Sequence, residues 1–395
     1  MSTTKAWNRR EFLASAAVGV AASALARRSF AADPVRVGLI LPKTGPFAST
    51  GRQVEAACRL YVQTNGDTAG GRKVELIMRD DTGTAPELTK RMAQELVARD
   101  HVDVLAGFGL TPLAFAAAPV ATESRVPMIV MAAATSSIPQ RSPFIVRSGF
   151  TLPQVTAPLA DWAPKNGIRK VVSLVSDYGP GIDAEKTFMK RFADAGGTVA
   201  EAVRAPLANP DFAPFVQRAK DAKADALFVF VPSGAGTAVM KQYAERGLRS
   251  AGTQLICTGD VVDDDILDAM GPPAIGIVSS HHYSAAHPSP ENKAYVDAFM
   301  RANPGMRPNF MSVGGYDGMH LIYAALAKTG GETDGEKLVG AMKGLAWQSP
   351  RGPMSIDPAT RDVVQNVYIR KVEQVDGKLF NVEFATIEAV RDPGA

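Results

Sequence analysis

The chain has 395 residues, of which 46% are hydrophobic and 21% are charged, and its formal net charge at pH 7 is +3. This composition is ordinary for a soluble globular protein, and it excludes an intrinsically disordered chain and a chain embedded in a membrane. The length is more than one hydrophobic core usually serves, so we expect two domains.

The first 31 residues have the pattern of an export signal. Arg9 and Arg10 stand before a run of small and apolar residues, 13–26, which is too short to span a bilayer stably. A small-x-small sequence ends at Ala31, so the segment resembles a twin-arginine signal cleaved near Ala31, with Asn8 where serine or threonine is usual. Without residues 1–31 the net charge is −1, because five basic residues and one acidic residue are removed. We therefore expect the mature chain in the periplasm, without nucleic acid as a partner.

After the signal, apolar strands alternate with helices. We predict strands at 35–40, 73–79, 103–106 and 126–131. The sequence Thr-Ala-Pro-Glu at 84–87 predicts a capping box for one of the intervening helices. Connections this short allow only right-handed crossovers, so the pattern predicts a parallel sheet that is covered by helices on both faces.

Two small, polar loops follow consecutive strands of this sheet. The first contains Thr111 as a predicted N-cap, with Pro112 at the first helical position, and the second is 132–137. The first N–H groups of a helix have no partner inside it, so they offer an anion site that the helix dipole strengthens. Each loop alone is explained by a helix cap or a turn. Together, at the carboxyl ends of neighbouring parallel strands, they indicate a ligand site.

The second half of the chain repeats the alternation and then changes. We predict five more strands and five helices between 153 and 280, which form a second α/β lobe. Helices at 291–302, 315–328 and 336–345 have no strong strand among them, so we expect them to return to the first lobe to bury their apolar faces. A hairpin at 365–386 is expected to join the second lobe.

Residue patterns that could indicate catalysis are incomplete. Ser233 lacks the Gly-x-Ser-x-Gly elbow of hydrolases, and we interpret it as a helix cap or a residue at the rim of a cleft. Three consecutive aspartates, 263–265, are interpreted as an acidic helix start. No Gly-x-Gly-x-x-Gly motif or P-loop accompanies the first strand, so no nucleotide cofactor is expected.

The histidines and cysteines also argue against a metal site. His281, His282 and His287 have no acidic or cysteine partner at ligand spacing, so we expect them at a crossover, in a solvent-exposed or rim position. Cys58 and Cys257 are about 200 residues apart, and two separate buried thiols are expected rather than a disulfide. No metal or other cofactor is predicted.

The order of the segments resembles the type I periplasmic solute-binding proteins, in particular the leucine/isoleucine/valine-binding group that serves ABC importers. The resemblance covers nearly all of the mature chain and rests on motifs at 37–40, 44–47, 147–151, 177–179 and 315–317. It implies an α/β fold of two doubly wound parallel-sheet lobes joined by three crossovers, near Phe150, Tyr283 and Gly352. The implied limits are 32–150 plus 284–351 for lobe 1 and 151–283 plus 352–395 for lobe 2.

The resemblance also implies ligand contacts between the lobes. Leu110 and Thr111 match the loop that gives a hydroxyl and amides to the ligand carboxylate. Ala134 and Thr135 match the following loop, whose backbone and hydroxyl normally bind both the carboxylate and the α-ammonium. Tyr178 matches the second-lobe aromatic residue that covers the ligand when the lobes close.

Two departures from the family pattern leave the ligand open. The loop 107–111 is more apolar than the serine-rich loop of amino-acid binders, and Asp260, followed by two valines, is near but not at the expected position of the acid that pairs with the ammonium. A buried ammonium without a partner is costly. If Asp260 misses the cleft, a carboxylate without an amine is the better ligand, and Phe47, Phe108 and Tyr178 could flank its aliphatic or aromatic body.

The resemblance therefore implies a binding protein and not an enzyme. The expected function is the periplasmic substrate-binding component of an ABC importer that takes a branched-chain amino acid or a related small carboxylate. Its permease and ATPase would be separate chains. The alternatives are a binder of an aromatic or aliphatic carboxylate that lacks the amine, a ligand sensor on the same fold and, less favoured, a periplasmic hydrolase.

Overall fold

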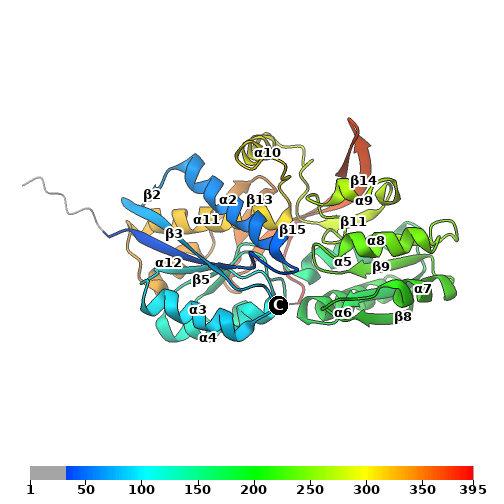
Figure 1. Ribbon diagram of the computed structural model, residues 1–395, viewed down its shortest axis with the longest axis horizontal. Helices are drawn as coiled ribbons and strands as arrows, with labels where there is room; N and C mark the ends of the chain where they lie inside the picture. Colours follow the sequence, from blue (N-terminus) through cyan, green and yellow to red (C-terminus); the bar gives the residue numbers. More distant parts are fainter. Residues whose placement is uncertain (1–32, 395) are drawn as a thin grey trace, which may run out of the picture. The chain divides into compact units, whose positions relative to one another are not determined.

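The computed structural model describes residues 33–394 of the chain (Figure 1). The predicted export signal lies outside the described residues. Val35–Ala395 group into one unit, which contains two β-sheets. Within the described residues, no helix combines the length and the apolar character needed to cross a membrane.

The first sheet has six strands in the order β2-β3-β1-β4-β5-β6. The neighbours from β3 to β6 are parallel, and only β2 runs antiparallel, beside β3. Its inner strands are almost entirely buried because helices cover both faces, which explains why they appear in the sequence as continuous apolar runs. The strands are β1 (Val35–Leu41), β2 (Thr68–Ala69), β3 (Arg72–Asp80), β4 (Val104–Gly107), β5 (Met128–Val130) and β6 (Ile145–Arg147).

Two pairs of helices cover this sheet. In Figure 1, α2 and α11 lie on one face and α3 and α4 on the other, and each pair is in contact. Two late helices, α10 and α12, contact α2 and α11 respectively. We call this sheet and its helices the first lobe. The helices are α2 (Ala48–Asn65), α3 (Pro86–Ala98), α4 (Thr111–Ser124), η1 (Pro139–Arg141), α10 (Pro290–Ala302), α11 (Phe310–Thr329) and α12 (Gly335–Met342).

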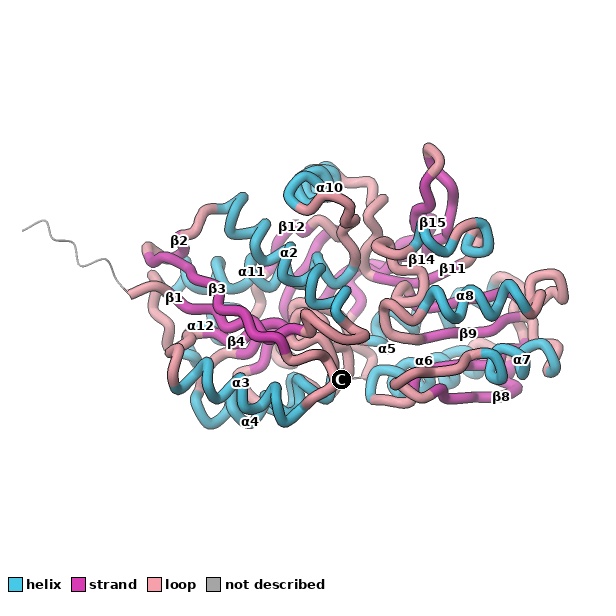
Figure 2. The backbone as a smooth tube through the Cα atoms, viewed as in Figure 1, coloured by secondary structure: helices cyan, strands magenta, loops and turns pink. Residues whose placement is uncertain are grey.

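The second sheet has nine strands in the order β12-β13-β14-β11-β10-β9-β7-β8, with β15 paired to β14. Strands β7 to β11 are parallel, whereas β12 to β15 form an antiparallel extension. Figure 2 shows the tip of the hairpin of β14 and β15 at the top right. The strands are β7 (Lys170–Ser176), β8 (Thr198–Ala205), β9 (Ala226–Phe230), β10 (Gln254–Thr258), β11 (Val278–His281), β12 (Ala346–Ser349), β13 (Gly352–Ile356), β14 (Val363–Val375) and β15 (Lys378–Val390).

Successive residues of the second sheet enter two different cores. Val171 packs with Phe188 of α6, whereas the adjacent Val172 packs with Val216 of α7 and Val239 of α8. This alternation is the period of a strand that is buried on both faces. We call this sheet and its helices the second lobe. The helices are α5 (Leu152–Lys165), α6 (Gly179–Asp194), α7 (Ala213–Asp221), α8 (Gly236–Glu245), α9 (Leu267–Met270) and η2 (Pro272–Ala274).

The chain passes between the lobes after β6, after β11 and between α12 and β12. The third passage precedes the position near Gly352 that the sequence suggests, because β12 already pairs with β13. Arg351 is fully buried beside these passages, where it donates to the carbonyl of Gly149 (2.9 Å) and pairs with Asp317 of α11 (2.8 Å). The lobe limits given above stay a prediction.

The fold class is therefore as predicted, whereas the predicted starts of several helices and strands are wrong. The capping box predicted at 84–87 is wrong, because Ala85 precedes α3 without a side-chain cap. Helix α11 starts at Phe310, earlier than predicted, because Asn309 forms a capping box with Ser312. Strand β12 is present where no strand was expected. The two cysteines are free and buried, as predicted.

Candidate functional site

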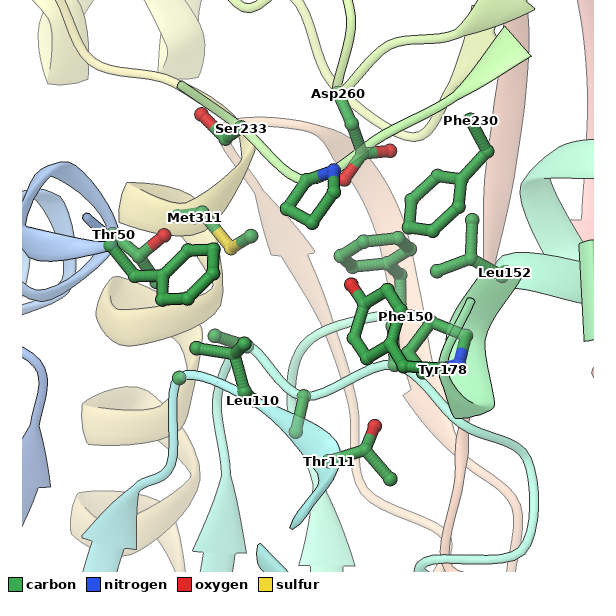
Figure 3. Close-up of a pocket in the computed structure, with 17 residues that line it drawn as sticks. Thr50, Leu110, Thr111, Phe150, Leu152, Tyr178, Phe230, Ser233, Asp260 and Met311 are labelled. Carbon is green, nitrogen blue, oxygen red and sulfur yellow. The ribbon is translucent and has the colours of Figure 1, made fainter. Parts of the chain in front are cut away.

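A cavity lies between the carboxyl-end loops of the two sheets (Figure 3). The empty space between its lining atoms, part of which is open to solvent, is about 380 Å³. The loops after β1, β4 and β5 contribute from the first lobe, and the loops after β7, β9 and β10 contribute from the second. Open α/β sheets bind ligands at this edge.

The first-lobe end of the cavity offers hydroxyls and backbone amides. Thr111 and Ala134 line it, and Thr135 lies directly behind, where its Oγ1 accepts a hydrogen bond from Thr111 Oγ1 (3.0 Å). Within residues 33–394, the N–H groups of these three residues donate to no backbone carbonyl. The predicted N-cap role of Thr111 is wrong: Leu110 is the N-cap, and Thr111 is the first residue of α4. The free amide of Thr111 therefore lies at the positive end of the helix dipole, where an anion is stabilised.

A buried arginine holds the second of these loops. Arg147 donates to the carbonyls of Ala133 (2.8 Å) and Thr135 (2.7 Å), and it pairs with Asp362 (2.5 Å). Burial raises the pKa of Asp362 to about 6, and the charge of Arg147 opposes that rise. Because the loop carbonyls are occupied by Arg147, the loop presents N–H groups to a ligand. Sequence reasoning placed Arg147 in a family motif but did not assign it this role.

The turn between β4 and α4, which leads to the first-lobe end of the cavity, has a strained backbone. Gly107 has a φ of 105°, and a Cβ there would lie 2.5 Å from the carbonyl oxygen of Ile40. Phe108 has a φ of 65°, which non-glycine residues rarely adopt. Phe108 is fully buried in the main core and does not line the cavity, so ordinary packing explains it. Strain of this kind often accompanies a binding loop.

Aromatic side chains line the middle of the cavity. Phe47 and Phe150 come from the segments after β1 and β6, and Tyr178 and Phe230 come from the second lobe. The rings of Tyr178 and Phe230 are stacked, with centroids 6.1 Å apart and an angle of 18° between their planes. Such walls suit a flat, apolar ring more closely than a charged or strongly polar body.

The second-lobe end carries a buried carboxylate. Asp260 is 3% exposed, and in Figure 3 it lies on the opposite side of the cavity from Thr111. Its Oδ2 is 3.4 Å from Nε2 of His281, beyond a normal hydrogen bond, and neither atom has a hydrogen-bond partner within the described residues. Asp260 therefore does reach the cavity.

The predicted crossover position is confirmed for His281 and His282, which lie at the end of β11 where the chain leaves the second lobe, but the predicted exposed or rim position is wrong for both. His281 and His282 are fully buried, and both rings pack against Phe150. Burial lowers the pKa of His281 to about 4, and it lowers the pKa of His282 well below the ordinary value of 6.5. The third member, His287, is partly buried and lies 2.8 Å from Glu383. No group of three metal-ligating side chains occurs among residues 33–394.

The run of three aspartates is not an acidic helix start. Helix α9 begins only at Leu267, and Asp263 is buried, where it accepts hydrogen bonds from Ser233 Oγ and Asn309 Nδ2. Burial raises the pKa of Asp263 to about 7. Ser233 lines the cavity, but its hydroxyl is already committed to Asp263. The partners of these groups come from distant segments, which no local sequence pattern could indicate.

Six of the seven residues named from the sequence line this one cavity, and Thr135 lies behind it. The six are Phe47, Leu110, Thr111, Ala134, Tyr178 and Asp260. Sequence reasoning missed Phe150, Phe230 and Met311 as lining residues. The signal for Phe230 was available, because it is the next-to-last residue of the strand predicted at 226–231, whose carboxyl end faces the site.

Two α/β lobes that enclose one cavity, with anion-binding loops on one side, define a two-lobed solute-binding protein. The comparison with known families agrees with this class: residues 34–378 match the periplasmic binding protein family, and the chain belongs to that family.

Similar proteins cover almost the whole chain. "Leu/Ile/Val-binding protein homolog 6" of Brucella abortus (strain 2308) is 46% identical over 383 residues, which is 96% of this chain and 98% of that protein. A solved structure of a solute-binding protein of an ABC transporter from Rhodopseudomonas palustris BisB5, in complex with 3,4-dihydroxybenzoic acid, is 58% identical in sequence and has a TM-score of 0.90. The match covers 92% of this chain and 99% of the R. palustris chain. Another, from R. palustris HaA2 with p-hydroxybenzoic acid, is 44% identical with a TM-score of 0.89 and the same coverage.

The family and these relatives are solute-binding proteins and not enzymes. This chain is accordingly a solute-binding protein of the ABC-transporter type. Proteins of the family are exported to the periplasm, where they bind small ligands for membrane partners.

Proposed function

We propose that this solute-binding protein captures an aromatic carboxylate, a benzoate that carries ring hydroxyl groups, and delivers it to an ABC importer. The permease and the ATPase would be separate chains, and residues 1–31 would direct export by the twin-arginine route. The ligand contacts proposed are Phe47, Leu110, Thr111, Ala134, Thr135, Tyr178 and Asp260.

One observation carries the proposal: the two polar ends of the cavity lie on opposite sides of an aromatic middle (Figure 3). The amides and hydroxyls around Thr111 and Ala134 suit a carboxylate. The rings of Phe47, Phe150 and Tyr178 suit a flat aromatic body. A benzoate places its carboxylate at one end of such a ring and leaves the other end to face the second lobe. The bound ligands of the two R. palustris relatives are of this chemical class.

A branched-chain amino acid is the second candidate. The curated relatives are named as leucine-, isoleucine- and valine-binding homologues, and Asp260 could pair with an ammonium. In an α-amino acid, however, the ammonium and the carboxylate are attached to the same carbon, so both partners must lie at the same end of the cavity. Thr111 and Asp260 lie at opposite ends (Figure 3). This separation favours the aromatic acid.

The proposed mechanism is closure of the two lobes around the ligand. A ligand can shift the equilibrium towards the closed state only if it contacts both lobes in that state. Contacts to Thr111 and Ala134 on one side and to Tyr178 and Asp260 on the other would meet this requirement. No covalent step is needed, because capture and release are both binding events.

Isothermal titration calorimetry of the purified mature protein tests the proposal. The titrants are benzoate, 4-hydroxybenzoate, 3,4-dihydroxybenzoate, leucine, isoleucine and valine. We expect the hydroxylated benzoates to bind most tightly and to raise the melting temperature as a ligand that binds the folded state does. Binding of the three amino acids without binding of any benzoate would overturn the proposal in favour of the second candidate.

A further inference from the structure

We propose that Asp260, positioned by His281, accepts a hydrogen bond from a ring hydroxyl at the far end of the ligand, and thereby selects hydroxylated benzoates over benzoate itself. The inference rests on the proposed function and adds a specificity determinant to it. Asp260 would touch the ligand, whereas His281 would act through Asp260.

The carboxyl group of Asp260 is buried, and one of its oxygens lacks a hydrogen-bond donor among the described residues. It follows β10, lines the cavity and is 3% exposed. Its Oδ2 has no hydrogen bond within residues 33–394. A buried charge without hydrogen bonds is costly, so an acceptor that faces a binding cavity favours a ligand that brings a donor to it. The aromatic walls lead from the anion-binding end to this carboxylate, so the donor would be attached to the far side of a ring.

His281 directs its Nε2 towards Asp260 without a close hydrogen bond, and it adds no neutralising charge. Nδ1 of His281 accepts the backbone N–H of His282 (3.0 Å), so the hydrogen of the neutral ring is on Nε2, which faces Asp260 at 3.4 Å. Because burial lowers the pKa of His281 to about 4, this ring is neutral at pH 7. Arg370 is a buried cation that interacts electrostatically with Asp260, and it directs its Nη groups to the carbonyl of Tyr283 and to Ser279 Oγ. The acceptor oxygen Oδ2 of Asp260 therefore stays available to a donor on the ligand.

This arrangement suits a phenol for two reasons. A phenol O–H is a donor, and a hydrogen bond to an ionised carboxylate is stronger than a bond between neutral groups. The two oxygens of a carboxylate can also accept from two adjacent hydroxyls, so a 3,4-dihydroxybenzoate would gain a second bond. Benzoate would leave Asp260 unsatisfied, and a site built to bind a hydroxyl rejects the analogue that lacks it.

The experiment compares the ratio of dissociation constants for benzoate and 4-hydroxybenzoate, measured by calorimetry at pH 7, with 3,4-dihydroxybenzoate as a third titrant. For the wild type we expect 4-hydroxybenzoate to bind at least about tenfold more tightly than benzoate. Asp260→Asn and Asp260→Leu should each reduce that preference by about tenfold, because binding of the hydroxylated acids should weaken by about that factor more than binding of benzoate. Asn replaces one acceptor oxygen by a donor, and Leu removes both acceptors.

His281→Phe tests the positioning role. The phenylalanine keeps the packing against Phe150 and Phe310 but removes the Nε2 donor, so the preference for the hydroxyl should fall while the affinity for benzoate is retained. His281→Gln, which can still donate, should restore part of the preference. His287→Gln is the matched control, because His287 also faces a carboxylate but does not line the cavity, and its ratio should equal that of the wild type.

The outcomes separate the inference from the proposed function. A wild type that binds hydroxylated benzoates, with the same preference in the Asp260 variants, overturns the inference and leaves the function intact. Equal losses for all three benzoates in those variants also overturn the inference, because they indicate a structural role. A wild type that binds no benzoate overturns both.

Discussion

Thr111 and Thr135 belong to loops after different strands, and their hydroxyls are joined by a 3.0 Å hydrogen bond. This bond uses the hydroxyl hydrogen of Thr111, while a hydrogen bond from the Thr135 side chain to Asp183 opposes the rise that burial causes in the pKa of that carboxyl. Both threonine side chains are buried. The anion-binding end of the cavity therefore depends on two threonines that are distant in sequence. They lie close together because β4 and β5 are parallel neighbours in the sheet.

We predict that Thr135→Ala weakens binding of the carboxylate ligand by about five- to tenfold, because it removes one polar partner from the anion-binding end. Calorimetry with 4-hydroxybenzoate measures the change. Thr122→Ala is the control: Thr122 is also a threonine hydroxyl, on α4, but it bonds to Ser142 and does not line the cavity. An unchanged dissociation constant for Thr135→Ala would remove this residue from the site.

Tyr178 is predicted to act through its ring. Tyr178→Ala should weaken binding of every benzoate by at least about tenfold, because it removes an aromatic wall that stacks on Phe230. Tyr178→Phe keeps that wall and should retain most of the affinity. Both variants should melt close to the wild type, since the side chain faces a cavity. If Tyr178→Phe binds as weakly as Tyr178→Ala, the hydroxyl and not the ring is the important group.

The residues that sequence reasoning located and those it misjudged differ in one physical respect. Thr111 and Tyr178 follow strands directly, so the carboxyl-end rule places them without knowledge of tertiary contacts. The environments of His281 and Asp263 depend on partners such as Phe150 and Asn309, which are more than 40 residues away in the sequence. Burial of a polar side chain is decided by such distant partners, so local patterns could not predict it.

Two helix N-termini, of α4 in the first lobe and α6 in the second, meet across the cavity. Gly179 is the first residue of α6, and a Cβ at this position would lie 2.7 Å from Thr135 Oγ1 and 3.5 Å from Thr111 Cγ2. The absence of a side chain therefore allows the second lobe to approach the anion-binding loops. This glycine belongs to the Asp-Tyr-Gly motif at 177–179, and the close approach gives that motif a physical reason.

We predict that Gly179→Ala weakens ligand binding by about tenfold or more while the melting temperature changes little, because the clash is between lobes and not within one. Calorimetry and thermal denaturation are measured on the same sample. Gly340→Ala in α12 is the matched control, since a Cβ there meets nothing within 4 Å. A large fall in the melting temperature with unchanged affinity would contradict the proposed contact between the lobes.

At the scale of the whole molecule, polar contacts join the lobes away from the proposed ligand contacts. Ser49 of α2 donates to Asp265 of the second lobe (3.0 Å), and the backbone N–H of Ser136 donates to Asp183 of α6 (3.2 Å). We expect these bonds to stabilise the closed arrangement whatever ligand is bound. They should therefore affect affinity without affecting selectivity.

Ser49→Ala is predicted to raise the dissociation constants of benzoate and of the hydroxylated benzoates by one common factor of about two to ten. The same calorimetric series that tests Asp260 measures this change. A factor that differs between benzoate and 4-hydroxybenzoate would mean that Ser49 influences recognition and not only closure. Ser124→Ala, whose hydroxyl bonds within its own helix, is a control that should leave all three constants unchanged.

The buried histidine beneath the cavity should also make the stability of the protein depend on pH. His281 has an ordinary pKa of 6.5, which burial lowers to about 4 in the folded chain. Between these pH values the unfolded chain binds a proton at His281 that the folded chain does not. The contribution of His281 to the free energy of unfolding therefore decreases as the pH falls from 6.5 to 4. The raised pKa values of Asp263 and Asp362, about 7 and about 6, act in the opposite direction over a similar range.

A comparison of two proteins isolates the histidine, because both carboxyl groups are present in each. Relative to His281→Phe, the wild type should lose up to roughly 3 kcal/mol of unfolding free energy between pH 7 and pH 4. Urea denaturation of both proteins at pH 7, 5.5 and 4.5 measures this difference. Parallel curves for the two proteins would show that the pKa of His281 is not lowered in the folded chain, which would contradict the effect assigned to its burial.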